Sequence, residues 1–226
     1  MTTAQDLLNA ALLHVPFDGW TAACFDAAAA DCGLSADEAR GMYPRGAVDM
    51  ALAFHRQGDA EMVARLKAAD LGEMRFRDRI AAGVRMRLEL ADREVVRRGM
   101  TLFALPQHAS DGAAALWGTS DLIWTTLGDS SRDVNWYTKR ATLSAVYSST
   151  VLYWLGDDSE GHAATWAFLD RRIDNVMSFE KFKAKARDSK LARAFMAGPG
   201  KILETIKAPG SPRPNYPGHW EQKENQ

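Results

Sequence analysis

The sequence predicts an all-α protein, and three observations lead to that fold class. Apolar residues recur with a period near 3.6 along most of the 226 residues. No stretch alternates polar and apolar residues between turn signals, as an exposed strand would. Breaker clusters such as PFDGW, CGLS, YPRG and LPQHASDG divide the chain into segments of helical length. We expect about nine or ten helices, and the 46% of apolar residues can build a sizeable core.

Three short helices are expected at about residues 3–15, 20–31 and 35–42, before a long helix from about 44 to 70. Ser35 and Glu38 have the spacing of a capping box, which should begin the third helix. Residues 1–44 thus have the layout of a helix-turn-helix head, whose third helix enters the major groove of DNA. This head contains six acids and one base, and Asp37 and Glu38 would face phosphate, so its charge disfavours nucleic-acid binding.

Residues 45–177 are expected to form a helical body, after which the sequence changes character. Residues 178–207 carry eight bases and three acids among apolar residues, which is typical of an amphipathic helix on anionic lipid. A solvated terminal helix is the alternative. The candidate membrane residues are Phe179, Phe182, Lys183, Phe195, Ile202 and Ile206. Residues 208–226 contain four prolines among polar residues, and we expect a disordered tail.

Charge, cysteines and hydropathy restrict the location of the protein. The formal charge of −1 argues against binding of nucleic acid by bulk electrostatics. Cys24 and Cys32 fit neither a disulfide framework nor a C-x-x-C site, so we expect a reducing compartment. No stretch approaches the roughly 20 apolar residues that span a bilayer, and the N-terminus lacks a signal-peptide pattern. We expect a cytoplasmic, bacterial-type chain without a targeting peptide, peripheral to the inner membrane.

The sequence contains no motif typical of an enzyme. The histidines at 14, 55, 108, 162 and 219 lack the H-x-x-x-H or E-x-x-H spacing of a metal site on one helix face. A G-x-S-x-G elbow is missing, and GPGK at 198–201 lacks the rest of a phosphate loop. We expect no catalytic residue, no metal and no cofactor. A binding role is therefore favoured over an enzyme in its own right.

The stretch DVNWYTKRATLSAVYSSTVLYWL, residues 133–155, has a polar start and an apolar continuation. Asp133 stands where an N-cap is expected, and Tyr137 and Arg140 can fix a neighbouring helix by hydrogen bonds. A helix here carries a stripe of large residues and a stripe of small ones. The first stripe is Trp136, Arg140, Leu143, Tyr147, Val151 and Trp154, and the second is Ala141, Ala145, Ser148 and Leu152. We expect both faces to be buried, in the core or at a dimer seam.

Residues 117–166 hold five of the seven tryptophans. A well-filled core explains this concentration. A cavity for a large apolar ligand or a docking surface explains it as well, because both favour aromatic side chains.

Several of these strings resemble one protein family. DVNWYTKRATLSAVYSSTVLYWLGDDS and TWAFLDRRIDNVM resemble the COQ-nine family of ubiquinone biosynthesis accessory proteins. LLNAALLHVPFDGWT, CGLS and LFALPQH fit the same family, so the resemblance covers about residues 5–180. It is specific, because a string such as D-x-N-W-Y-T-[KR]-R is improbable by chance. The basic segment and the proline-rich tail depart most from the family pattern.

The resemblance implies a fold like that of TetR regulators, without DNA binding, and a homodimer. It implies a pocket for an isoprenoid quinone lipid, contact with a membrane surface, and presentation of the intermediate to demethoxyubiquinone hydroxylase, a di-iron enzyme. By the same resemblance, the partner-docking residues are Trp154, Leu155 and Trp166. The lipid-binding candidates, chosen for apolar size, are Leu102, Phe103, Trp117, Trp124, Tyr147 and Val151. A TetR-type ligand-responsive transcriptional regulator is the alternative function, and the acidic third helix discriminates against it.

Overall fold

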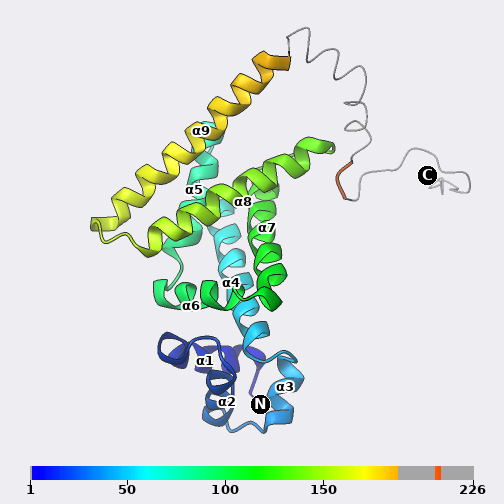
Figure 1. Ribbon diagram of the computed structural model, residues 1–226, viewed down its shortest axis with the longest axis vertical. Coiled ribbons are helices and arrows are strands. Elements are labelled where there is room, and N and C mark those ends of the chain that lie inside the picture. The colour runs from blue at the N-terminus through cyan, green and yellow to red at the C-terminus, as the bar shows by residue number, and fades with distance from the viewer. Residues whose placement is uncertain (1, 188–206, 210–226) are drawn as a thin grey trace, which may run out of the picture.

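The computed structural model describes residues 2–187 and 207–209, and the regular structure in these residues is entirely helical (Figure 1). The α-helices are α1 (Ala4–Asp18), α2 (Ala22–Asp31), α3 (Ala36–Met42), α4 (Ala47–Ala68), α5 (Phe76–Glu89), α6 (Arg93–Phe103), α7 (Ala109–Thr126), α8 (Val134–Leu155) and α9 (Ala163–Arg187). Short 3₁₀ turns at Pro106–His108 and Glu160–His162 precede α7 and α9. The all-α prediction is confirmed.

Helices α1, α2 and α3 form the head at the N-terminal end of the molecule (Figure 1). The predicted capping box is present: the Glu38 amide donates to Ser35 Oγ, and the Ser35 amide donates to the Glu38 carboxylate. The head's own hydrophobic cluster includes Leu7, Trp20 and Phe25. It also takes in Met50 and Ala51 of α4 and Val95 of α6, so the core of the head extends beyond residue 44.

Helix α1 is longer than the sequence predicts. It continues through Pro16 to Asp18, although the PFDGW cluster was expected to end it near residue 15. Pro16 has no N–H to donate to Leu12 O, so one helical hydrogen bond is lost, but its fixed φ is compatible with a helix and the chain continues for two more residues. Gly19 ends the helix instead: its φ of 69° is in the left-handed region that favours glycine, and its N–H donates to Val15 O at 2.9 Å.

Helix α4 rises from the head into the body, where α5, α7, α8 and α9 pack around a second core, and α6 lies across the junction (Figure 1). Fully or nearly fully buried members of this second cluster include Met62, Val84, Leu88, Ile123, Trp154 and Leu169. The described residues therefore form two hydrophobic clusters, one in the head and one in the body, joined by α4 and α6.

Helix α8 buries one of its two predicted stripes. Arg140, Leu143, Tyr147, Val151 and Trp154 are buried, and Trp136 is half-buried. In the second stripe, by contrast, Ala141, Ala145 and Leu152 are exposed and Ser148 is half-buried. The expectation of two buried faces is therefore wrong for the single chain, because α7 and α9 pack against α8 and leave that stripe uncovered. The dimer seam stays a prediction.

Helix α9 continues past residue 177, where the body was expected to end, and reaches Arg187 without a break. Of the candidate membrane residues, Phe179, Phe182 and Lys183 lie in this last part of α9, for which only the backbone is described. Phe195, Ile202 and Ile206 lie outside the described residues, as does most of the predicted tail. Within the described part of the chain, none of the helices combines the length and the apolar character of a membrane span.

Candidate functional site

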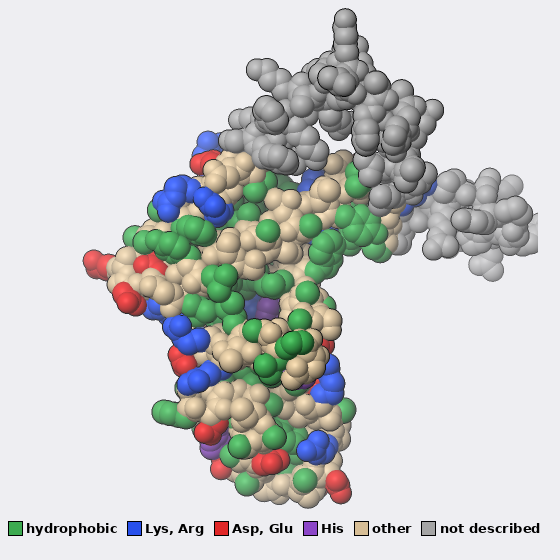
Figure 2. All heavy atoms as spheres, viewed as in Figure 1, with side chains coloured by type: hydrophobic (Ala, Val, Ile, Leu, Met, Phe, Trp, Pro, Cys, Tyr) green, Lys and Arg blue, Asp and Glu red, His purple; other side chains and the backbone are tan. Residues whose placement is uncertain are grey.

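A cavity of about 390 Å³ lies between α4, α6, α7 and α8, where the head meets the body. In the view of Figure 2, the middle of the molecule has a hollow in which histidine and basic side-chain atoms lie among hydrophobic ones. Most of the wall is apolar and includes Phe54, Leu88, Val96, Met100, Phe103 and Leu116. Small-molecule pockets in proteins typically measure about 300–1,000 Å³ and have mostly apolar walls with a few polar groups. The cavity has the size and the lining of such a pocket.

Small residues on α7 provide the space for this cavity. Ala109, Gly112, Ala113 and Ala115 all line it, so the wall on this side lies close to the helix backbone. A Cβ atom on Gly112 would lie 2.7 Å from the Cβ of Phe103, which shows how closely α7 approaches this aromatic side chain. The cavity thus depends on the run of small residues in ASDGAAALW, a signal that was not used to predict the site.

The polar part of the wall is built around a buried ion pair. Arg87 Nε lies 2.7 Å from Asp59 Oδ1, and the side chains of Arg87 and Asp59 are 4% and 6% exposed. Arg87 Nη2 also donates to the carbonyl oxygen of His55 at 3.1 Å, which fixes the guanidinium on α4. Thr119 Oγ1 donates to Asp59 Oδ1 at 2.9 Å, and His55 Nε2 lies 2.8 Å from the same hydroxyl. Three helices, α4, α5 and α7, are joined by this network.

The protonation states at this end of the cavity follow from the same contacts. Burial raises the pKa of Asp59, but the hydrogen bond from His55 and the charge of Arg87 outweigh it, so this pKa lies below its ordinary value. Burial raises the pKa of the Tyr147 phenol, which lines the cavity beside Arg87. At neutral pH, Asp59 is therefore ionised opposite Arg87, and Tyr147 keeps its proton.

Gly58 is required by this ion pair. Alanine in a helix interior is normally favoured over glycine by up to about 1 kcal/mol. At position 58, however, a Cβ would lie 2.7 Å from Arg87 Nη1, and the guanidinium cannot move without leaving Asp59. We expect Gly58→Ala to lower the free energy of unfolding by about 1–3 kcal/mol in denaturant titrations.

Gly118→Ala on α7 is the matched control, because no atom lies within 4 Å of the Cβ position. It should raise the free energy of unfolding by about 0.5–1 kcal/mol. Equal stabilisation by both substitutions would contradict the tight packing of Arg87 on α4.

The predicted lipid-binding residues fall into separate places. Phe103, Tyr147 and Val151 line the cavity. Leu102 packs against the head cluster, and Trp117 lies 5.8 Å from Trp136, ring centroid to ring centroid, outside the cavity. Trp124 lines a second cavity of about 230 Å³, together with Phe76, Arg77, Ile80, Lys139, Val146 and Ile173. The structure thus brings three of the six together, and lipid binding by all six stays a prediction.

His55, Asp59 and Arg87 were not predicted to belong to a site. His55 is one of the histidines without the spacing of a metal site, although Asp59 follows it at the i+4 spacing that places both on one helix face. That spacing was the available signal. Arg87 is 28 positions beyond Asp59 and only the packing of α5 on α4 brings them together.

The three predicted docking residues differ in exposure. Trp154 and Leu155 are 2% and 8% exposed and belong to the body core. Trp166 is half-buried; its Nε1 donates to Gly161 O at 2.8 Å, and the Arg85 guanidinium carbon lies 4.9 Å from its ring centroid. Trp166 is therefore partly accessible at the surface and packs against the cluster to which the buried Trp154 and Leu155 belong, and the docking role of all three stays a prediction.

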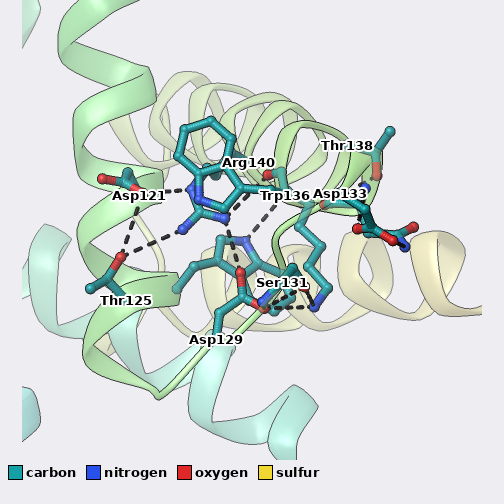
Figure 3. Close-up of polar contacts among 11 residues, drawn as sticks. Asp121, Thr125, Asp129, Ser131, Asp133, Trp136, Thr138 and Arg140 are labelled. Atoms are coloured by element: carbon teal, nitrogen blue, oxygen red, sulfur yellow. Dashed lines mark hydrogen bonds and ion pairs between the residues drawn. The ribbon is translucent and has the colours of Figure 1, made fainter. Parts of the chain in front are cut away.

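The polar start of the DVNWYTKR stretch holds helices together (Figure 3). The N-cap prediction is confirmed: Asp133 Oδ1 accepts from the Asn135 amide at 3.0 Å. Arg140 points between Asp121 of α7 and Asp129 of the α7–α8 loop, at 2.5 and 2.9 Å. The guanidinium carbon of Arg140 also lies 4.0 Å from the ring centroid of Trp136. As predicted for Arg140, these contacts fix a neighbouring helix.

The same stretch also holds a later part of the chain. Tyr137 Oη donates to the carbonyl oxygen of Lys207 at 3.2 Å. The amide of Ala208 donates to the carbonyl oxygen of Arg132 at 3.0 Å, and Ala208 is buried. Residues 207 and 208 are thereby attached beside the start of α8.

Within the residues that the structure describes, histidine, cysteine and acidic side chains form no group of three or more that could hold a metal ion.

Comparison with known proteins identifies relatives of the chain. The COQ9 family model matches residues 109–180. The protein named ubiquinone biosynthesis protein COQ9, mitochondrial, of Drosophila melanogaster is 34% identical over 180 residues, 77% of this chain and 55% of that protein. The Homo sapiens protein of the same name is 32% identical over 181 residues, 76% of this chain and 57% of that protein. The chain thus spans little more than half the length of these relatives.

A solved structure shows the fold. The crystal structure of the TetR transcriptional regulator from Nitrosomonas europaea aligns with a TM-score of 0.62 at 19% identity, over 76% of this chain and 95% of that chain. The helical arrangement is therefore that of TetR regulators, as expected from the sequence. The chain is a homologue of the COQ9 proteins, with the COQ9 family domain in residues 109–180 and a TetR-like helical fold.

Proposed function

We propose that this chain is an accessory protein of ubiquinone biosynthesis, which binds an isoprenoid quinone intermediate and presents it to demethoxyubiquinone hydroxylase at a membrane surface. The observation that carries the proposal is the mostly apolar cavity with one polar end, in a homologue of proteins named for ubiquinone biosynthesis. The role is that of a binding protein rather than an enzyme, because the buried polar side chains of the cavity wall are largely occupied with one another.

Such a protein is needed because the isoprenoid tail of the intermediate is strongly apolar. Moving apolar groups from water into an apolar environment gains about 0.8 kcal/mol for each methylene. A long tail therefore stays in the bilayer unless another apolar environment shelters it while the headgroup reaches an enzyme. The cavity between α4, α6, α7 and α8 offers such an environment.

Membrane contact and dimerisation are further parts of the proposal. The basic segment 178–207 would bind anionic lipid through its bases, each contributing about 1 kcal/mol near the surface. The exposed stripe of Ala141, Ala145 and Leu152 on α8 would meet a second copy, because small residues allow helices to approach closely. The relatives are named as mitochondrial proteins, and they give no support to the expectation of a cytoplasmic, bacterial-type chain.

Mass spectrometry of lipids extracted from the purified protein tests the proposal. We expect an isoprenoid quinone or its precursor to co-purify with the unmodified chain. Ala113→Phe should reduce this, because Ala113 lines the cavity at an exposed position and a benzyl group there would obstruct it. Ala114→Phe is the matched control, because Ala114 is exposed on the same helix but does not line the cavity. Absence of isoprenoid lipid from all three proteins would overturn the proposal.

Trp166→Ala tests the docking of the hydroxylase. We expect loss of co-purification with the hydroxylase, because a half-buried tryptophan that a partner can reach is typical of interface hot spots. The free energy of unfolding should stay within about 2 kcal/mol of the unmodified value, because the side chain is only partly buried. Trp117→Ala, another half-buried tryptophan, should retain co-purification. An unfolded Trp166→Ala protein, or equal loss with both variants, would contradict a docking role.

A transcriptional regulator is the alternative function. The TetR-like fold agrees with it, but the acidic charge of α3 does not. Asp37 and Glu38 are exposed in the first turn of α3, and the guanidinium carbon of Arg40 lies 5.8 Å from the ring centroid of Phe25. Acidic side chains at this position repel phosphate. A gel-shift assay that found tight, salt-sensitive binding to a specific operator would favour the regulator.

A further inference from the structure

The hydroxyl group of Tyr147 is placed in an unusual way. The side chain is 4% exposed, lies on the face of α8 that packs against the body core, and lines the large cavity. Among the described residues, its hydroxyl makes no hydrogen bond within the protein, and its oxygen is not one of the fully enclosed polar atoms that lack a partner. A hydroxyl without a protein partner, on a buried side chain that lines a cavity, is available to an occupant of that cavity.

The neighbouring charges limit the kind of occupant. Arg87 lines the same cavity, but Asp59 already neutralises it at 2.7 Å. The Thr119 hydroxyl donates to the same carboxylate, and His55 Nε2 lies 3.3 Å from Asp59 Oδ2. An anionic ligand at this wall would therefore meet a charged pair with no net positive charge. Because an unpaired charge is costly to bury, this wall favours an uncharged polar group over a carboxylate or a phosphate.

The apolar lining of the cavity restricts the chemistry of the remaining part of the ligand. Phe103, Met100, Val151 and Leu116 surround the space beyond the polar wall, and the other lining residues of α7 have small side chains or none. A ligand that fits must have an apolar body and an oxygen acceptor at one end.

We propose that the Tyr147 hydroxyl, supported by the Asp59–Arg87 pair, is the anchor for an uncharged oxygen acceptor, such as a quinone carbonyl, on a ligand whose apolar part fills the rest of the cavity. This inference rests on the proposed function and adds the residue that recognises the headgroup. With this anchor, the cavity should bind neutral quinones more tightly than carboxylates of similar length.

Tyr147→Phe isolates the hydroxyl, because the ring and its packing are kept. Affinities for three probes would be measured by competition against an environment-sensitive apolar fluorophore: a ubiquinone with two isoprene units, a hydrocarbon of similar length, and a fatty acid of similar length. One neutral hydrogen bond corresponds to about a three- to tenfold change in affinity. We expect Tyr147→Phe to weaken quinone binding by that factor and to leave hydrocarbon binding unchanged.

Tyr153→Phe is the matched control on the same helix. Tyr153 is 40% exposed, and its ring stacks on Phe168 with centroids 4.5 Å apart, away from the cavity lining. It should bind all three probes like the unmodified protein. Thermal unfolding of each variant checks that the fold is retained.

The outcomes separate the inference from the proposed function. Equal quinone affinity in Tyr147→Phe and the unmodified protein, or an equal loss for quinone and hydrocarbon, would overturn the anchor and leave lipid binding intact. Tighter binding of the fatty acid than of the quinone by the unmodified protein would overturn the stated selectivity. Failure of the unmodified protein to bind either the quinone or the hydrocarbon would overturn both the inference and the proposed function.

Discussion

Arg140→Met is expected to lower the free energy of unfolding by about 3–5 kcal/mol, as removal of one partner of a buried ion pair does. Arg140 and Asp129 both have side chains that are 2% exposed, and methionine retains most of the aliphatic volume of arginine. The substitution leaves the Asp129 carboxylate buried with Lys139 as its remaining cation. It also removes the bond to Asp121, which ties α7 to α8. Chemical denaturation followed by circular dichroism measures the loss.

Arg140→Lys is the control for charge. It keeps a cation but cannot contact Asp121 and Asp129 at once with the fixed geometry of a guanidinium, so we expect an intermediate loss. A stability for Arg140→Met within about 1 kcal/mol of the unmodified protein would place the pair among weak surface contacts.

The same contacts predict an acid-dependent part of the stability. Burial raises the pKa of Asp129, but hydrogen bonds from Lys139, Arg140 and Ser131 outweigh it and lower this pKa to about 2. A carboxyl group whose pKa is lowered by folding stabilises the native state above its unfolded pKa of about 4, and this contribution is lost as the pH falls toward 2. Denaturant titrations between these values should show a smaller pH dependence for Arg140→Met than for the unmodified chain.

Trp154→Ala is the second substitution with a large expected effect, a loss of about 3–5 kcal/mol in the free energy of unfolding. Trp154 is 2% exposed at the end of α8, with the His162 ring 6.0 Å away and the Arg93 guanidinium carbon 5.8 Å away, measured to its ring centroid. Arg93 also donates to the carbonyl oxygen of Leu155 at 3.1 Å, so the substitution opens a cavity where α6 closes the end of α8. Calorimetric or denaturant unfolding measures the effect.

Trp154→Phe is the control for packing. The Trp154 indole N–H is buried and has no hydrogen-bond partner among the described residues, so its removal costs no hydrogen bond there. We expect less than half of the loss seen with alanine, because phenylalanine fills most of the space. A stable Trp154→Ala protein that no longer co-purifies with the hydroxylase would instead support the docking role predicted from the sequence.

Local features of the fold could be predicted from the sequence because the groups involved lie within a few residues of each other. Ser35 and Glu38 meet across one turn of α3, and Asp133 reaches an amide two residues later. The apolar stripe of α8 follows from helical periodicity alone. Helix α1 extends beyond its predicted end because the helix accommodates Pro16, and Gly19, whose left-handed φ the sequence does not reveal, ends it.

The candidate site was harder to predict because its members are distant in the sequence. Asp59, Arg87 and Tyr147 lie on α4, α5 and α8, and only the packing of these helices brings them to one wall. Predictions made from apolar size alone do not distinguish one cavity from another. Phe103 lines the cavity between α4, α6, α7 and α8, whereas Trp124 lines the second, smaller cavity. Volume is created by the small residues of α7, and a search for large apolar side chains overlooks them.

The attachment of Lys207 and Ala208 beside the start of α8 has a topological consequence. Tyr137 bonds to Lys207, which lies 70 residues later in the sequence, and Arg132 bonds to Ala208. The start of α8 is therefore a point where three parts of the chain meet, because Arg140 of the same helix also bonds to Asp121 of α7 and to Asp129 of the α7–α8 loop. A substitution that displaces the start of α8 would disturb all of these contacts together.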